Sequence, residues 1–316
     1  MTFTVTVDVE QIKEDLSPIG TYYGNEFVGT FGLLNLFRKL NIQAIFFLDV
    51  GESLNSVSPT EFSNTVKKIK ESNNEIGLHI HPARVNFHNS ESVAFHSETG
   101  FITDYTHIEK RKLLESKKIA LERELGYPCT TFRSGSYAID EGTIDLLKEI
   151  GFNKDFSVFW GYSPLMSGNE NFGNLGNIPT SGISIVPVTS FLVEIPIIRK
   201  QVRKKIDPAW ISLREFRKLL SVFPQNANIE FFLHSFSLMN GKTGKPNTFA
   251  IKHFCKLVNA AREASHENIT IHQLPELKFP EISIKLGPFD YTPKEILKLV
   301  LPKLRSRSRS AKKILI

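Results

Sequence analysis

Four short apolar segments of this 316-residue chain end in ionisable side chains, and this feature constrains the fold more than any other. The residues at these four ends are Asp8 with Glu10, His79 with His81, Arg133, and His234. A charged side chain at the end of a buried strand costs free energy unless it is paired or binds a metal. In parallel α/β folds, the carboxyl ends of the strands meet the loops that form ligand sites. The pattern therefore predicts a parallel sheet whose strand ends contribute to one shared site.

Segments with the periodicity of strands alternate along the chain with segments that have the periodicity of helices. Strands are expected at residues 3–9, 44–50, 75–81, near 132, 154–159, 228–234 and 269–274, and helices at 29–40, 61–71, 108–125, 141–150, 211–222 and 247–264. Residues 161–190 are rich in Gly, Asn, Ser and Pro and are expected to form a loop inserted over one face of the core. The repeated strand–helix units predict an α/β fold with a mainly parallel sheet, open or closed as a barrel.

The side chains at the strand ends are spaced so that they can share a metal ion. Residues i and i+2 of a strand point the same way, so Asp8 and Glu10 share one face, and His79 and His81 share a face of another strand. Two imidazoles and a carboxylate from a neighbouring strand form a set that catalytic zinc sites use, with one position left open for water. Each short pattern alone is more often structural, as a helix cap, a surface pair or a core histidine. Their occurrence together, each after an apolar strand, favours catalysis.

The positive charge of the chain is concentrated near its end. The formal net charge is +6, and residues 292–316 carry eight basic residues and one acidic residue, so the remaining body is close to neutral. A neutral body lacks the basic surface that nucleic-acid binding requires, and no nucleic-acid partner is expected. The two cysteines lie far apart in the sequence, which disfavours a disulfide framework and a cysteine-based zinc site.

The two ends of the sequence suggest where the protein works. The first residues alternate as a strand does and lack the features of a secretory signal, so a cytoplasmic location is expected. Residues 293–301 place apolar side chains on one helical face and are followed by a basic segment, a combination that can lie on an anionic membrane surface. This reading predicts peripheral contact with the inner face of the membrane and a lipid-linked sugar as substrate. A helix docked on the body with a solvated tail is an equal alternative.

Taken in order, the strand-end motifs resemble those of the polysaccharide deacetylase (NodB-homology) family over about residues 3–274. The first motif of that family is a pair of aspartates, and this chain has the spaced form TVDVE at residues 6–10, with Glu in the second place. The resemblance implies that Asp8 is the catalytic base and that Glu10 binds the metal. It also implies a distorted (β/α)7-type barrel at residues 1–280, with residues 281–316 as a C-terminal extension.

The second motif, EIGLHIHP at residues 75–82, lacks two residues that the family has between its two histidines. The resemblance assigns His79 and His81 as metal ligands, with His88 as an alternative for the second of them. The third motif, FRSGSY at residues 132–137, is one residue longer than in the family and has no proline. It implies that Arg133 holds Asp8 ionised and that backbone amides near Ser136 and Tyr137 stabilise an oxyanion.

The fourth and fifth motifs complete the resemblance. Residues 151–158 are similar to the family segment that contains an aspartate, which implies that Asp155 supports the site. The segment FFLHS at residues 231–235 matches the fifth motif and implies that His234 is the general acid.

The implied activity is removal of an acetyl or formyl group from an amino sugar, in the biosynthesis of a surface polysaccharide or glycolipid. The implied cofactor is a divalent metal, zinc first, with cobalt, nickel or manganese as alternatives. A second enzymatic interpretation keeps the site but changes the substrate to a non-sugar amide. A third, from a different class, is a catalytically silent carbohydrate-binding relative, which the altered second and third motifs leave open.

Overall fold

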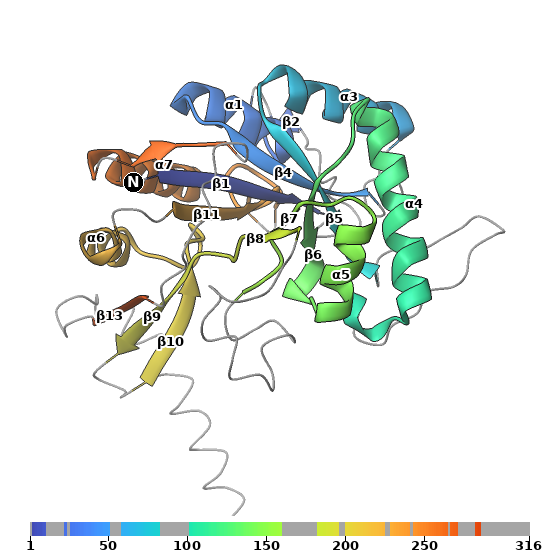
Figure 1. Ribbon diagram of the computed structural model, residues 1–316. Coiled ribbons are helices and arrows are strands. Elements are labelled where there is room, and N and C mark those ends of the chain that lie inside the picture. The colour runs from blue at the N-terminus through green and yellow to red at the C-terminus, as the bar shows by residue number, and fades with distance from the viewer. Residues whose placement is uncertain are drawn as a thin grey trace, which may run out of the picture.

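A parallel sheet that curls on itself organises the computed structural model (Figure 1). The structure describes residues 2–10, 22–23, 26–50, 58–82, 101–159, 182–195, 200–224, 228–240, 243–264, 266–270 and 282–285. Seven strands follow one another in the order β11-β1-β4-β5-β6-β7-β8, and every pair of neighbours is parallel. These strands are β1 (Thr2–Val9), β4 (Ala44–Asp49), β5 (Glu75–Ile80), β6 (Thr131–Ser134), β7 (Lys154–Asp155), β8 (Ser184–Ile185) and β11 (Asn228–His234).

The strand order is that of a β/α barrel left open at one seam. The strands from β1 to β8 follow chain order, and β11 returns to pair with β1 on its other side. A short strand, β12 (Glu267–Asn268), also pairs with the start of β1. The predicted fold, a distorted (β/α)7-type barrel, is therefore confirmed.

The seam between β8 and β11 is bridged by other contacts. The hydroxyl of Thr189 accepts a hydrogen bond from the amide of Glu230 at 2.9 Å. The carbonyl of Ile206 accepts one from the amide of Phe232 at 3.0 Å. Ile206 directly follows β10 (Lys200–Lys205), which pairs with β9 (Ser190–Ile195), and β9 also pairs with β13 (Ile282–Lys285). This small second sheet therefore lies against the open side of the barrel.

Helices cover the outer face of the sheet (Figure 1). They are α1 (Thr30–Leu40), α3 (Pro59–Glu71), α4 (His107–Leu125), α5 (Glu141–Glu149), α6 (Leu213–Val222) and α7 (Thr248–Glu263). Ser58, Thr106 and Ser212 begin α3, α4 and α6 with capping boxes, in which a glutamate three residues on bonds back to the cap. Among the helices that the structure describes, none has both the length and the apolar composition needed to span a bilayer.

Alternation along the strands separates two interiors. In β1, Phe3, Val5 and Val7 belong to the large apolar core between sheet and helices. The alternate residues Thr4, Thr6 and Asp8 are also buried, but they make polar contacts with β6 and β11 across the inside of the barrel. The side chains on the inner face are apolar around Ile45 and Phe47 and form ion pairs toward the carboxyl ends of the strands.

Some expected elements differ from the structure. The strand expected at 269–274 is wrong where it can be compared, because the strand is β12 at Glu267–Asn268, while residues 271–274 lie outside the described part. The loop expected at 161–190 contains β8 and the first residue of β9 in its described part. The sequence analysis also missed the hairpin of β9 and β10, because the mostly cationic segment KQVRKK of β10 has no apolar alternation. The helix expected at 293–301 and the basic tail lie outside the described residues.

Candidate active site

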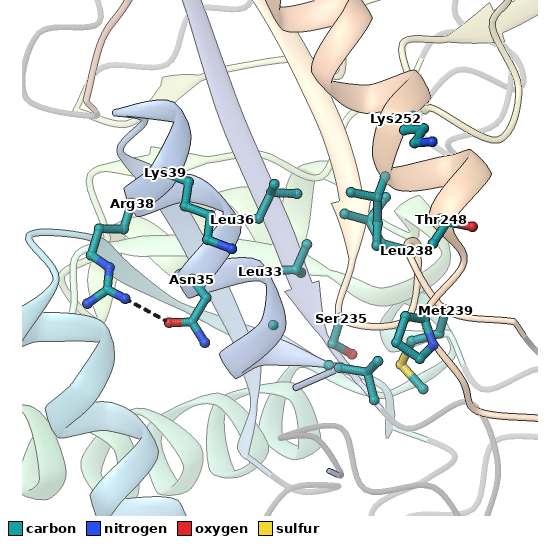
Figure 2. Close-up of a pocket in the computed structure, with 15 residues that line it drawn as sticks. Leu33, Asn35, Leu36, Arg38, Lys39, Ser235, Leu238, Met239, Thr248 and Lys252 are labelled. Carbon is teal, nitrogen blue, oxygen red and sulfur yellow. Dashed lines mark hydrogen bonds between the residues drawn. The ribbon is translucent and has the colours of Figure 1, made fainter. Parts of the chain in front are cut away.

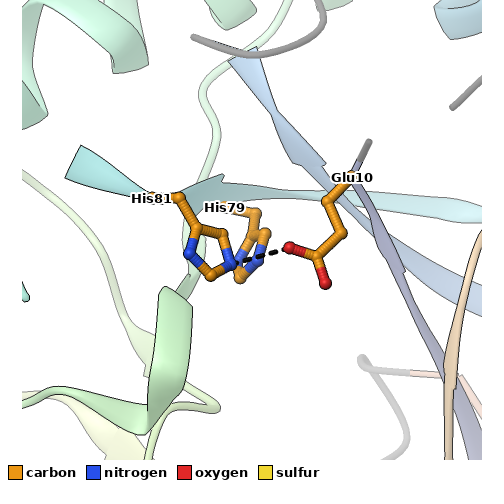
Figure 3. A group of neighbouring side chains, drawn as sticks. All are labelled: Glu10, His79 and His81. Atoms are coloured by element: carbon orange, nitrogen blue, oxygen red, sulfur yellow. Dashed lines mark ion pairs between the residues drawn. The ribbon is translucent and has the colours of Figure 1, made fainter. Parts of the chain in front are cut away.

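Glu10, His79 and His81 form a compact group at the carboxyl ends of β1 and β5, which we call the ligand cluster (Figure 3). One potential ligand atom from each residue lies within 4.8 Å of the others. Nδ1 of His79 lies 2.9 Å from the carbonyl oxygen of Arg133 and must donate to it, because a carbonyl can only accept. The hydrogen therefore sits on Nδ1, and Nε2 presents a lone pair.

The Nε2 atom of His79 is buried and has no hydrogen-bond partner. Oδ2 of Asp8 lies 4.0 Å from it, which is too far for a hydrogen bond. Buried polar atoms are rarely left unsatisfied, and an orphan at a candidate functional site calls for an explanation such as an ion. A histidine that donates one ring N–H to a backbone carbonyl and offers the other nitrogen to a metal is a common arrangement. The residues of the ligand cluster therefore fit a divalent metal.

The position of His81 depends on the absence of a side chain at Gly135. A Cβ atom at Gly135 would lie 2.5 to 2.6 Å from three atoms of the His81 ring. The ring packs against this backbone, edge-to-face with His79 at a centroid distance of 4.8 Å, and its Nε2 lies 2.8 Å from Oε2 of Glu10. Gly135 thereby lets His81 reach the ligand cluster.

Arg133 is fully buried and binds Asp8. One terminal nitrogen, Nη1, donates to Oδ1 of Asp8 at 2.8 Å and to the hydroxyl of Thr6 at 3.0 Å. Burial is the largest influence on the pKa of Asp8 and acts to raise it, but the charge of Arg133, joined by His79 and His234 when they are protonated, outweighs it, so the pKa is lowered. Asp8 is therefore ionised at neutral pH, as the sequence resemblance implies.

The sequence analysis missed Glu230, the second carboxylate that binds Arg133. It lies in the middle of β11, is 2% exposed, and accepts a hydrogen bond from the hydroxyl of Thr6 at 2.6 Å. Arg133 also donates from Nε to the carbonyl of Phe156, and its guanidinium lies over the rings of Phe47 and Phe232. The sequence did contain a signal for Glu230. It is a carboxylate inside the apolar strand NIEFFLH, and strand alternation places it on the same face as His234.

His234 lies beside Glu10 at the mouth of the barrel. Its Nε2 is 3.2 Å from Oε1 of Glu10, and its ring stacks on Phe236 at 4.8 Å. Burial lowers the pKa of His234, and the negative charges of Glu10 and Asp8 only partly oppose this shift. A lowered pKa makes the protonated ring a stronger acid, which suits a proton donor.

Ser136 and Tyr137 form a strained turn directly after β6. Their φ angles are 56° and 57°, in the left-handed region, which costs a residue other than glycine about 1 to 3 kcal/mol. The ring of Tyr137 packs on Phe159 and Phe232, and its hydroxyl accepts a hydrogen bond from Lys205 at 2.8 Å. Burial and the nearby charge of Asp8 raise the pKa of Tyr137. Gly135, the residue before this turn, packs against the ring of His81, so the turn borders the ligand cluster.

Asp155 contacts Ser157, and among the described residues no member of the ligand cluster forms a hydrogen bond with it. It is fully buried and accepts hydrogen bonds from the hydroxyl and the amide of Ser157. The Ser157 hydroxyl in turn accepts one from the amide of Ser134 at 2.8 Å. Asp155 therefore supports the end of β6 through Ser157. The alternative ligand His88 lies outside the described residues.

A second concavity lies between α1 and α7, with a volume of about 440 Å³ (Figure 2). Its lining combines apolar side chains, for example Leu33, Leu238 and Ile251, with the cations Arg38, Lys39 and Lys252. Ser235, the neighbour of His234, reaches its edge, but no residue of the ligand cluster lines it. The chemistry described above therefore lies outside this groove.

Comparison with known proteins gives matches in structure only. No model of a known protein family matches the chain, and no curated protein matches it significantly. Similar solved structures include a chitin deacetylase from Colletotrichum lindemuthianum, with 12% identity, coverage of 88% of this chain and 91% of that chain, and a TM-score of 0.49.

Two further structures are similar. One is a family 4 carbohydrate esterase from Streptomyces lividans, with 9% identity, coverage of 89% and 97% of the two chains, and a TM-score of 0.46. The other is a polysaccharide deacetylase from Bacillus cereus, with 13% identity, coverage of 88% and 96%, and a TM-score of 0.45. At this level of identity and structural similarity, only the residues of the site bear on the function.

Replacing Gly135 by alanine should weaken metal binding, because the new Cβ displaces the ring of His81. We expect the affinity for zinc to fall by about 10-fold or more, measured by competition with a chromogenic chelator. Gly142→Ala is the matched control, since a Cβ there meets only one atom, 3.8 Å away. Equal zinc affinity of Gly135→Ala and the parent protein would contradict the role given to His81.

Asp155 should make stability depend on pH. Burial raises the pKa of Asp155 from 3.8 to about 6, so the folded state holds this proton more tightly than the unfolded state. The contribution of Asp155 to the free energy of unfolding should therefore fall by about 3 kcal/mol as the pH rises from 4 to 6. Asp155→Asn removes this dependence. Urea unfolding of both proteins in chelator should show that the parent loses stability relative to the variant as the pH rises from 4 to 6, and parallel curves would contradict the prediction.

Proposed function

We propose that this protein is a metal-dependent hydrolase that removes a small acyl group, acetyl or formyl, from an amino sugar. The observation that carries the proposal is the buried, unpartnered Nε2 atom of His79. It belongs to a carboxylate–histidine–histidine cluster that has an ionised aspartate and a third histidine beside it. This combination supplies a metal ligand set, a base and an acid within one site.

Glu10, His79 and His81 would hold the metal. Nitrogen and oxygen donors of this kind suit zinc best, and cobalt, nickel and manganese accept them as well. When bound, the ion acts as a Lewis acid that polarises the amide carbonyl and makes water more acidic. Glu10 is ready for this role, because its pKa is lowered: burial acts to raise it, but the hydrogen bond and charge of His81 and the charge of His234 prevail.

Asp8 is placed to accept a proton from the attacking water. Arg133 binds its Oδ1 atom, while Oδ2 faces the Nε2 atom of His79 at 4.0 Å. One carboxylate oxygen is thus held by an ion pair and the other is directed at the ligand cluster. As the oxygen of water adds to the carbonyl carbon, its proton passes to Oδ2.

His234 is placed to complete the reaction. The C–N bond breaks only if the departing nitrogen gains a proton, since an amide anion is a very poor leaving group. Nε2 of His234 lies 3.2 Å from Oε1 of Glu10, and His234 is the neighbour of Asp8 in the register of β11 and β1, so it can deliver this proton within the same site. The backbone of Ser136 and Tyr137 would stabilise the oxyanion of the tetrahedral intermediate. The products are a carboxylic acid and a free amine.

An amino sugar is the proposed substrate because the motifs at the site resemble those of carbohydrate deacetylases. A non-sugar amide would be cleaved by the same residues. The cytoplasmic location, the lipid-linked substrate and the membrane contact stay predictions, since the basic tail lies outside the described residues.

Removal of the metal and replacement of Asp8 should abolish activity by different routes. Chelation should stop release of acetate or formate from a panel of N-acylated sugars and simple amides, and zinc should restore it. Asp8→Asn should lower the rate by about 100-fold or more with zinc still bound, because only the proton acceptor is lost.

Asp145→Asn is the matched control, an exposed aspartate on α5 that should keep both activity and zinc. Full activity in chelator would contradict metal dependence. Loss of zinc from Asp8→Asn would instead make Asp8 a ligand.

A further inference from the structure

Lys205 is a buried cation that the mechanism above does not use. It is 3% exposed, although it belongs to the largely cationic strand β10. Its Nζ atom lies 2.8 Å from the hydroxyl of Tyr137, 3.5 Å from Oδ2 of Asp207 and 3.6 Å from the centre of the Phe232 ring. A lysine ammonium normally extends to water, so its enclosure among these groups requires a reason.

The backbone around Lys205 fixes its side chain at the mouth of the barrel. The carbonyl of the next residue, Ile206, accepts a hydrogen bond from the amide of Phe232 in β11. Lys205 and Asp207 flank Ile206 in the sequence, and their side chains form an ion pair with each other. The side chain of Lys205 therefore approaches Tyr137 from the side of the seam opposite to β6.

The hydrogen bond from Lys205 restrains Tyr137, which lies in a strained turn. Ser136 and Tyr137 are consecutive residues with left-handed φ angles, and neither is glycine. Such strain persists only where the surrounding structure holds it, and it occurs preferentially at functional sites. Packing on Phe159 and Phe232 places the Tyr137 ring, and the hydrogen bond from Lys205 fixes its outer end.

We propose that Lys205 is a positioning residue whose hydrogen bond to the Tyr137 hydroxyl holds the strained Ser136–Tyr137 turn in the conformation that the reaction requires. Lys205 acts across 68 residues of sequence, from the small second sheet to the turn after β6. The catalytic consequence rests on the proposed function, because it assumes that the backbone of this turn stabilises the oxyanion. The effect on the turn itself does not depend on that assumption.

The test compares Lys205→Met, Tyr137→Phe and the double variant in zinc-loaded protein. Each single change removes the same hydrogen bond, and Tyr137→Phe leaves the buried charge in place. We expect each to lower kcat on an N-acetylated chitin oligosaccharide by about 10- to 100-fold with KM changed by less than about 3-fold. The kcat of the double variant should be no lower than that of the less active single variant, because both single changes remove the same hydrogen bond. Lys205→Arg should recover part of the rate.

Lys204→Met is the matched control. Lys204 is the preceding residue in β10, and it pairs with Glu215 at 2.6 Å, away from Tyr137. Its loss removes the same charge from the same strand and should leave kcat unchanged.

A second measurement needs no substrate. Amide hydrogen exchange of the peptide that contains Ser136 and Tyr137 should rise by about 10-fold or more in Lys205→Met and Tyr137→Phe, and stay unchanged in Lys204→Met. Unchanged exchange and kcat in Tyr137→Phe would overturn the proposal, as would additive losses in the double variant. If the parent protein has no deacylase activity but exchange rises as expected, the proposed function fails and the positioning role of Lys205 stands.

Discussion

The ion pair between Arg133 and Asp8, inside the barrel, is the interaction on which the rest of the structure depends. Taking a charge out of water costs several kcal/mol, and burial is offset only by close partners and full hydrogen bonding. Arg133 has both, with Asp8 from β1, Glu230 from β11, Thr6 and a backbone carbonyl as acceptors. One side chain of β6 thus binds β1 and β11, although β4 and β5 stand between these strands and β6 in the sheet. Loss of Arg133 would leave two buried carboxylates uncompensated.

The same residue sets up both halves of the proposed chemistry. Its guanidinium holds one oxygen of Asp8 and leaves the other facing the ligand cluster. Its backbone carbonyl accepts the Nδ1 proton of His79, which fixes the tautomer that a metal ligand needs. The turn that follows it carries Gly135 beneath His81, and then Ser136 and Tyr137. The residues proposed as base, as histidine ligands and as oxyanion backbone are therefore positioned from one short segment of the chain.

Strand alternation explains what the sequence could predict. It placed Asp8 with Glu10 on one face of a strand and His79 with His81 on one face of another, and the meeting of the carboxyl ends of parallel strands predicted that the two pairs lie together. It could also have found Glu230, which breaks an apolar strand. Residues such as Lys205 and Gly135 could not be found this way, because their roles depend on contacts between distant segments. The two-residue strand β8 is likewise set by pairing with β7, and no local propensity marks it.

The central claim is that Glu10, His79 and His81 bind one divalent cation through the lone pair that the Arg133 carbonyl leaves on Nε2 of His79. Anomalous diffraction from crystals grown with zinc, recorded above and below the zinc absorption edge, tests it most directly. The account predicts a single strong peak within coordination distance, about 2.0 to 2.2 Å, of Nε2 of His79, a ring nitrogen of His81 and a carboxylate oxygen of Glu10. A peak elsewhere, or none at this cluster with the three side chains ordered, would contradict it.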